Sequence, residues 1–310
     1  MSDVRAPATP LGVGVSMGAG AYLLWGLFPA FFPLLEPAGP VEILAHRVVW
    51  TLVLMLVLVT VTGRLRKLRG LPLRTWVMVA AASAMISVNW GTYILAVNTG
   101  RVTEAALGYF INPLVSVLLA VVVLHERLRR LQWVAVGIAV VAVVVLTVAY
   151  GRPPVIALVL ACSFGTYGLI KKTIPLDPRS SLTAEGLVAA PVALGYLVFL
   201  GLQGGSTFLS EGPGHTELIV TSGLVTAVPL LLFAGAAQRV PLATIGLLQY
   251  LTPVIQFLYG VFVNHEPMPA SRLLGFGLIW LALVVFSADM LRRTRRRPVQ
   301  PVTAEAGAVA

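Results

Sequence analysis

The sequence predicts an all-α integral membrane protein of ten transmembrane helices, arranged as two inverted five-helix repeats. Composition is the first reason: 58% of the 310 residues are hydrophobic, 11% are charged and the mean hydropathy is +0.90. A soluble domain carries about 25% charged residues, and single cores stop growing near ~250–300 residues. The lone Cys162 allows no internal disulfide and no cysteine-based zinc site. Composition therefore argues against a soluble enzyme, a disordered chain and a disulfide scaffold.

The second reason is a series of apolar stretches that are long enough to cross a bilayer, which takes about 20 residues. The first five predicted spans are Leu11–Leu35, Val41–Thr62, Thr75–Asn98, Ala105–Leu124 and Leu131–Tyr150. The second five are Pro153–Ile170, Leu182–Leu202, Leu218–Gln238, Val240–Val263 and Leu273–Ala288. Several end at Pro, Gly or a basic pair, as helices often do. The first stretch is 25 residues long without an A-x-A cleavage site, so we expect a retained helix rather than a signal peptide.

The distribution of Lys and Arg predicts the orientation of these spans. Of the 22 basic residues, 18 fall on one side of the predicted membrane, 3 on the other, and Arg47 lies inside a span. Both termini are therefore expected in the cytoplasm, and the net charge of +10 is a topology signal rather than a nucleic-acid footprint. The predicted regions are a cytoplasmic N-terminus (1–10), two repeats (11–150 and 151–290) and a basic, then disordered, cytoplasmic tail (291–310).

The third reason is an internal repeat with an offset of 140 residues. It places Pro113 on Pro253, and the pair His125-Glu126 on His265-Glu266. Five spans is an odd number, so the second copy enters the membrane from the opposite face. Inverted repeats of this kind build secondary transporters, with the substrate site between the copies near mid-membrane.

Spans 4 and 9 carry matching polar stripes at helical spacing. The stripes are Tyr109, Asn112 and Ser116 in span 4, and Gln249, Thr252 and Gln256 in span 9. Each stripe contains a proline, Pro113 or Pro253, which removes a backbone donor and is expected to kink the helix. The stripes indicate either the wall of a wet cavity or a pair of helices joined by interhelical hydrogen bonds.

Other polar residues lie inside the predicted spans. Asn89, Trp90 and Tyr93 in span 3 suit a solute contact, and they equally suit ordinary helix packing. Arg47, beside His46, is costly in a membrane unless it is functional or snorkels to the interface. Glu185 in span 7 is either a coupling carboxylate or an interfacial one.

The two His-Glu pairs close spans 4 and 9 at opposite faces. They either gate the openings, since histidine titrates near neutral pH, or mark helix ends. Two other signals are weaker. Gly14-Val15-Ser16-Met17-Gly18 fits a serine hydrolase pattern, but it opens a membrane helix, so the Gly14/Gly18 spacing predicts a close-packing face that a homodimer can use. There is no P-loop sequence and no metal-binding motif.

Several long motifs resemble the RarD-type branch of the EamA family in the drug/metabolite transporter (DMT) superfamily. They include W-G-L-F-P from Trp25, E-I-L-A-H-R-V-V-W from Glu42, N-W-G-T-Y-I-L-A-V-N from Asn89, T-A-V-P-L-L-L-F-A from Thr226 and L-Q-Y-L-T-P from Leu248. The resemblance covers about Gly12 to Asp289. It implies a ten-helix inner-membrane permease of two EamA repeats, in a branch with a historical link to chloramphenicol sensitivity.

We therefore expect a secondary-active transporter that exports an amino acid, metabolite or drug by alternating access, without catalytic residues, cofactor or metal. The expected partners are the small-molecule solute, the lipid bilayer and a coupling proton. The expected solute contacts are Arg47, Asn89, Trp90, Tyr93, Tyr109, Asn112, Gln249 and Tyr250. The expected coupling or gating residues are His46, Glu126, Glu185 and Glu266. The alternative is a polytopic membrane protein without flux, namely a sensor, a lipid-handling protein or a membrane enzyme.

Overall fold

The computed structural model describes residues 10–125, 128, 130–171, 173–237, 239–240 and 242–296. Within these ranges the chain is helical and contains no β-strand. The helices of the first half are α1 (Pro10–Gly26), α2 (Phe28–Phe31), η1 (Phe32–Leu35), α3 (Pro40–Val61), η2 (Arg64–Leu68), α4 (Leu73–Asn98), α5 (Val102–Leu124) and α6 (Arg130–Tyr150). The helices of the second half are α7 (Val155–Lys171), α8 (Pro178–Leu202), α9 (Pro213–Ala237), α10 (Leu242–Leu248), α11 (Leu251–Leu258), η3 (Tyr259–Val263) and α12 (Ala270–Arg296).

Seven of the described helices, α3, α4, α5, α6, α8, α9 and α12, are long and apolar enough to cross a membrane. An eighth span results if the bent pair Leu11–Gly26 and Phe28–Leu35 counts as one crossing, and the apolar helices Val155–Lys171 and Leu251–Val263 are shorter. The chain is therefore a multi-pass helical membrane protein. Helix occurs in every one of the ten predicted segments, and ten crossings remain a prediction.

The predicted first span bends by 44° after Gly26. Pro29 has no N–H, so the carbonyl of Trp25, four residues earlier, loses its helical donor. The amide Nε2 of Gln256 donates to that carbonyl at 3.1 Å. Thr252 Oγ1 likewise donates to the carbonyl of Tyr22 at 2.7 Å. Polar side chains of α11 therefore hydrogen-bond the backbone of α1 where this predicted span breaks.

The predicted ninth span is also interrupted, at Gln249 and Tyr250 between α10 and α11. Pro253 lies in the first turn of α11, where a missing N–H is tolerated, and the carbonyl that it leaves free belongs to Gln249. By contrast, α5 continues through Pro113. The π-helical η3 follows α11 and ends the segment at Val263.

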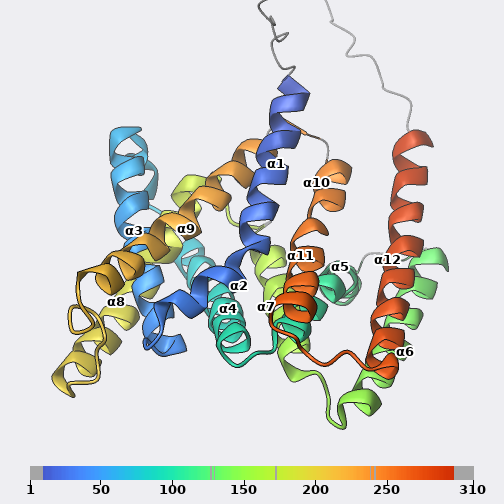
Figure 1. The fold of residues 1–310 in the computed structure, drawn as a ribbon. Coiled ribbons are helices and arrows are strands. Elements are labelled where there is room, and N and C mark those ends of the chain that lie inside the picture. Colours follow the sequence, from blue (N-terminus) through green and yellow to red (C-terminus); the bar gives the residue numbers. More distant parts are fainter. Residues whose placement is uncertain are drawn as a thin grey trace, which may run out of the picture.

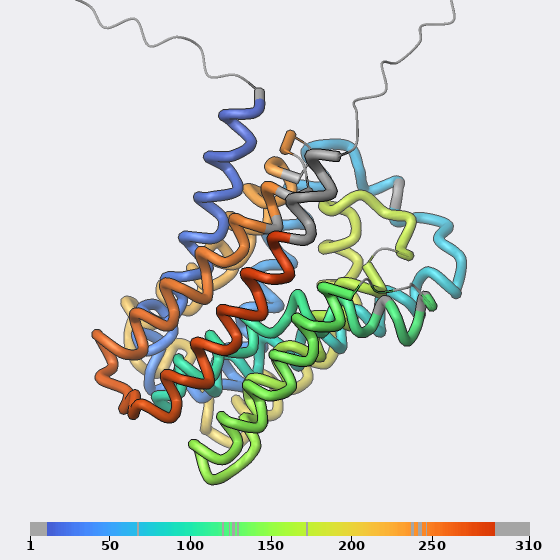
Figure 2. The backbone as a smooth tube through the Cα atoms, turned by 90° about the vertical axis from the view of Figure 1, so that its right-hand side faces the viewer, coloured from blue at the N-terminus to red at the C-terminus, as the bar shows by residue number. Residues whose placement is uncertain are grey.

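The helices pack in a sequence of neighbouring pairs across the molecule (Figure 1). The pair α6 and α12 forms one edge, which faces the viewer in Figure 2, and α3, α8 and α9 form the opposite side in Figure 1. Between them, α5 packs on α7 and α11, α4 packs on α7, and α1 packs on α9 and α11. The first described turn of α1 and the last described turn of α12 lie at the same end of the bundle (Figure 1).

The close-packing face predicted at Gly14 and Gly18 exists, but its neighbours belong to the same chain. A Cβ on Gly14 would lie 2.6 Å from Cβ of Arg239, and one on Gly18 would lie 2.9 Å from Leu248 Cδ1. Both glycines are buried. The prediction that this face is open to a second copy is therefore wrong, because the region joining α9 to α10 already fills it.

Candidate functional site: a buried arginine in an aromatic box

The guanidinium of Arg47 is a buried charge about two turns into α3. The residue is only 2% exposed. Its Cζ lies 4.2 Å from the ring centroid of Trp90, 5.2 Å from that of Phe28 and 5.5 Å from that of Phe32. We call Arg47 with these three rings the arginine box. Side chains from α3, α4, α2 and η1 thus converge on one cation.

One polar contact completes the surroundings of this cation. Arg47 Nε donates to Thr226 Oγ1 on α9 at 2.6 Å, and Thr226 Oγ1 itself donates to the carbonyl of Ser222. Atom Nη1 of Arg47 is buried and has no hydrogen-bond partner in the described part of the chain. Within the described ranges, no carboxylate lies at ion-pair distance from Arg47. The snorkelling alternative is wrong, because the side chain stays inside the bundle.

An arginine in such a place is costly. Insertion scales put the cost of a central charge at about 2.5–3.5 kcal/mol, and stacking on desolvated aromatic faces returns about 2 kcal/mol or more per good contact. The rings therefore offset much of the penalty, but they leave one N–H donor unsatisfied. A buried donor without an acceptor costs about 1–3 kcal/mol.

Three other predicted contact residues border the arginine box. Tyr93 packs its ring 6.0 Å from Phe32 and 5.7 Å from Tyr109. The Tyr109 hydroxyl donates to Asn89 Oδ1 at 3.3 Å, and Asn89 Nδ2 donates to the carbonyl of Leu160 at 3.0 Å and to Ser163 Oγ at 3.1 Å. Asn89 therefore ties α4 to α5 and α7.

Trp90 also lines a small cavity between α3, α4 and α8, which reaches Glu185. Its volume is about 20 Å³, which is room for about one water molecule and not for an organic solute. Ser83, on the same wall, donates to the carbonyl of Glu185 at 3.0 Å, and Trp90 lies about two turns further along α4. The cavity thus runs from Glu185 to the arginine box.

The remaining predicted contact residues behave differently. Asn112 is buried in α5, and Ser116 Oγ donates to its Oδ1 at 3.5 Å. Gln249 and Tyr250 lie at the break before α11, and Tyr250 packs against a hydrophobic cluster built from α5, α6, α7, α11 and α12. The structure therefore brings Trp90 onto Arg47 and places Asn89, Tyr93 and Tyr109 around them, whereas Tyr250 belongs to another core.

Glu185 is 3% exposed and lies in a fully bonded cluster between α7 and α8. Its carboxylate forms a short ion pair with Lys171, whose ammonium also donates to Ser181 Oγ at 2.6 Å. Ser181 Oγ donates to Glu185 Oε1 at 3.0 Å, and the Tyr167 hydroxyl donates to Oε2 at 3.1 Å. Both carboxylate oxygens are therefore satisfied.

His46, beside Arg47, faces the loop that joins α8 to α9. Its ring centroid lies 4.7 Å from that of Phe208, and its Nε2 is buried without a partner. One turn earlier, buried Glu42 accepts hydrogen bonds from the backbone N–H of Thr207 at 2.7 Å and from Ser206 Oγ at 3.2 Å. The start of α3 is therefore fastened to this loop.

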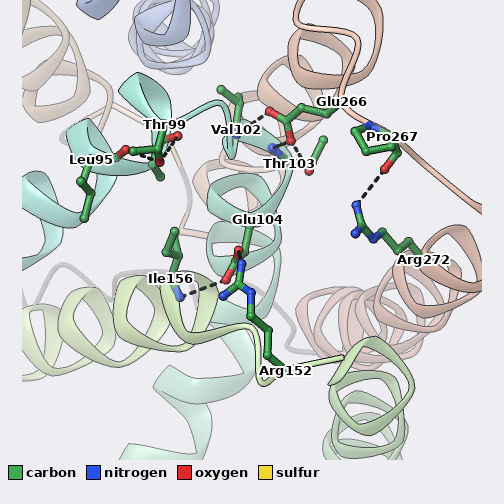
Figure 3. Close-up of polar contacts among 11 residues, drawn as sticks. Leu95, Thr99, Val102, Thr103, Glu104, Arg152, Ile156, Glu266, Pro267 and Arg272 are labelled. Atoms are coloured by element: carbon green, nitrogen blue, oxygen red, sulfur yellow. Dashed lines mark hydrogen bonds and ion pairs between the residues drawn. The ribbon is translucent and has the colours of Figure 1, made fainter. Parts of the chain in front are cut away.

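Two carboxylates cap helix N-termini (Figure 3). Glu266 accepts from the backbone N–H groups of Val102 at 2.6 Å and Thr103 at 3.0 Å, the first residues of α5. Glu104 accepts from the N–H of Ile156 in α7 at 3.1 Å, and pairs with Arg152 at 3.0 Å. The counterpart Glu126 lies outside the described residues.

Comparison with known proteins gives the family. The model of the EamA-like transporter family matches the chain twice, over residues 12–148 and 153–288. The chain belongs to the EamA-like transporter family. It is 55% identical to "Protein RarD" of Streptomyces exfoliatus over 91% of this chain and 90% of that protein. The transporter YojE of Bacillus subtilis, described as uncharacterized, is 43% identical over 91% and 96% of the two chains.

"Protein RarD" of Escherichia coli (strain K12) is 38% identical, over 91% of this chain and 96% of that protein. A solved crystal structure, described only as that of a protein, matches 92% of this chain and 99% of its own at a TM-score of 0.60 and 16% identity, which shows the fold alone. The chain is thus a RarD-type permease of the EamA family and a multi-pass membrane transporter by family.

Sequence reasoning missed several residues that shape the site of this EamA-family chain. Phe28 and Phe32 stand in an ordinary apolar run, and Thr226 is one of many hydroxyl residues in the spans. The predicted span Pro153–Ile170 leaves Lys171 in the following loop. In the structure it lies in the last turn of α7 and pairs with Glu185. The only signal for Lys171 was its distance of 14 positions from the predicted intramembrane carboxylate.

Proposed function

We propose that the chain is a secondary-active permease that exports a small organic solute by alternating access of two inverted five-helix halves. The observation that carries this proposal is the arginine box: an unpaired buried cation at the meeting point of helices from both halves. A buried ionisable group inside a membrane protein is a functional-site candidate by default. The Thr226 contact makes it a site shared between the halves.

The packing supports an inverted repeat. If the halves exchange, α1 corresponds to α7, α4 to α9, and α6 to α12. The observed contact of α1 with α9 then corresponds to that of α7 with α4, and α6 with α12 corresponds to itself. The family model matches each half once. His125 and His265, equivalent under the repeat, share a left-handed backbone, with φ of 54° and 52°.

In this proposal the solute contacts are Arg47, Asn89, Trp90, Tyr93, Tyr109 and Asn112, with Gln249 and Tyr250 joining when the halves rearrange. The cavity between Trp90 and Glu185 marks the route toward the cytoplasm. Because the cavity holds about one water, loading a solute requires α3, α4 and α8 to separate.

Glu185 is the proposed proton-coupling group. Protonation removes its charge and weakens its attraction to Lys171, which loosens the contact between α7 and α8. Glu266 is the proposed gate at the other end, because it holds the start of α5 to the segment that follows η3. His46 and Glu126 complete the proposed gating set. We place this transporter in the bacterial inner membrane with both termini in the cytoplasm, as the distribution of Lys and Arg predicts.

The test uses purified protein in liposomes that contain a pH-sensitive dye. Amino acids, other metabolites and chloramphenicol are added one at a time under an imposed proton gradient. We expect a solute-dependent pH change with wild type and with Glu217→Gln, an exposed carboxylate on α9, and a loss of this change in Glu185→Gln. Solute flux that is identical in Glu185→Gln and wild type contradicts the coupling role. A folded protein that moves none of these solutes contradicts the transport proposal for these classes.

A further inference from the structure

We infer that Arg47 is the anchor for a carboxylate group of the transported solute, so that the arginine box selects monoanionic or zwitterionic organic acids. This inference rests on the proposed function, since it names the chemical class that the transport site takes. It starts from one observation: the guanidinium is buried in the bundle, yet Nη1 finds no acceptor among the residues that the structure describes.

Other buried charges in this chain have all their hydrogen-bonding atoms satisfied by partners within the chain. Glu185 has Lys171, Ser181 and Tyr167; Glu104 has Arg152 and the Ile156 N–H. Arg47 has one hydroxyl and three rings. Aromatic rings lower the free-energy cost of burying a cation, but they do not replace the strong hydrogen bonds that a carboxylate accepts from a guanidinium. The missing acceptor is therefore the part that a ligand supplies.

The chemistry of the box favours a carboxylate over a phosphate. Arginine presents a planar fork that matches a carboxylate with two parallel hydrogen bonds. Arg47 is the only Lys or Arg in α3 and α9, and Arg74, the one Lys or Arg in α4, lies about four turns before Trp90. One positive charge balances a monoanion and leaves a phosphate dianion half neutralised.

The walls of the box select the rest of the solute. Phe28, Phe32 and Trp90 line the guanidinium, and the ring of Tyr93 packs against Phe32 beside them. An acid with an aromatic or branched apolar body fits these walls through ring stacking and burial. A cationic solute without a carboxylate is repelled, and a neutral amide of the same shape leaves the charge of Arg47 unbalanced.

The experiment compares an acid with its amide on the purified protein. The probes are phenylacetate and phenylacetamide at about 10 mM, at matched ionic strength, with thermal unfolding in detergent as the readout. With a dissociation constant of about 1 mM, phenylacetate raises the melting temperature of wild type by about 2–4 °C, and phenylacetamide leaves it unchanged. The variants are Arg47→Met, Arg47→Lys and, as a matched control, Arg152→Met, whose guanidinium is already paired with Glu104.

We expect the phenylacetate shift to disappear in Arg47→Met, to be reduced in Arg47→Lys and to persist in Arg152→Met. Size-exclusion elution and a ligand-free melting curve show whether each variant is folded. If Arg47→Met does not fold, Arg47→Lys and Arg47→Gln carry the comparison. The inference is overturned if phenylacetate gives no shift in wild type, if the amide gives an equal shift, or if the full wild-type shift persists in folded Arg47→Met or Arg47→Gln.

The liposome assay separates this inference from the proposed function. Flux of a carboxylate solute that is unchanged in Arg47→Met leaves transport standing and overturns the carboxylate anchor. An Arg47-dependent shift with phenylacetate, together with no flux of any carboxylate under a gradient, leaves the anchor standing and overturns transport.

Discussion

The chain buries charge in two different ways, in the arginine box and in the cluster around Glu185. Both charges lie inside the helical bundle, at 2% and 3% exposure. Glu185 has a cation and two hydroxyl donors, whereas Arg47 has a hydroxyl and aromatic faces. Helix α8, which carries Glu185, packs on α3, which carries Arg47. The small cavity that Glu185 and Trp90 both line joins the two regions.

This difference distinguishes a buried charge that stabilises the fold from one that is available to a ligand. A buried pair that satisfies itself contributes to the fold, and removing one partner leaves an uncompensated charge. A buried charge that is not satisfied contributes little to the fold and remains available to a ligand. The comparison therefore predicts opposite stability effects for similar substitutions in the two regions.

The largest effect is expected for Lys171→Met, which leaves the Glu185 carboxylate buried without its cation. Breaking a buried ion pair lowers the free energy of unfolding by about 3–5 kcal/mol. Because the side chain of Lys171 is 26% exposed, we expect a loss of about 3 kcal/mol here. Thermal unfolding in detergent measures the loss. Lys171→Arg is the conservative control, and the double variant Lys171→Met/Glu185→Met is expected to recover most of the stability. A wild-type melting temperature for Lys171→Met contradicts the structural role of the cluster.

Gly223→Ala is expected to follow, because it separates α9 from α3 beside the arginine box. An added Cβ would lie 2.5 Å from the carbonyl carbon of Trp50. Such overpacking costs about 1–3 kcal/mol and moves Thr226 away from Arg47. Gly137→Ala, which meets nothing within 4 Å, serves as the control and is expected to be neutral or to stabilise by up to about 1 kcal/mol. Equal melting temperatures for the two variants are incompatible with this close approach.

Glu266→Ala is expected to lower stability by about 1–2 kcal/mol, since it uncaps the first N–H groups of α5. Hydrogen exchange at Val102 and Thr103 is expected to accelerate. Glu211→Ala, at an exposed loop position, is the matched control. Unchanged exchange at both residues in Glu266→Ala contradicts the capping role.

Arg152→Met is expected to have a smaller effect, about 1 kcal/mol. Arg152 is 44% exposed, so solvent screens its pair with Glu104, and Glu104 keeps the N–H of Ile156. The melting temperature in low and high salt checks this, because salt reduces the difference between wild type and variant. A loss as large as that of Lys171→Met shows that exposure does not set the strength of these pairs.

The sequence was enough to predict helical class, the helical segments and the buried polar positions of spans 2, 3 and 7, because hydropathy and helical spacing are local. The partners of these positions were not predictable. Arg47 contacts Thr226 across 179 positions, and Asn89 contacts Leu160 across 71. Such pairs depend on how helices of the two halves pack, which a single sequence does not state.

The helix breaks show the same limit. Pro29 is visible in the sequence, yet the first stretch was predicted as one span, because the acceptor it frees is satisfied by Gln256 far along the chain. The sequence leaves open whether the polar stripe of span 9 lines a cavity or forms interhelical hydrogen bonds, and the residues of the stripe differ in this respect. Thr252 and Gln256 bond α1, while Gln249 lies at the break.

The measurement that tests the central claim most directly is the ligand-free melting temperature of Arg47→Met against wild type. If Arg47 is held for a ligand, replacing its unsatisfied charge by an apolar chain leaves stability unchanged or raises it, as replacing buried ionic groups often does. A fall as large as that expected for Lys171→Met shows instead that Arg47 holds the helices together, and contradicts the account.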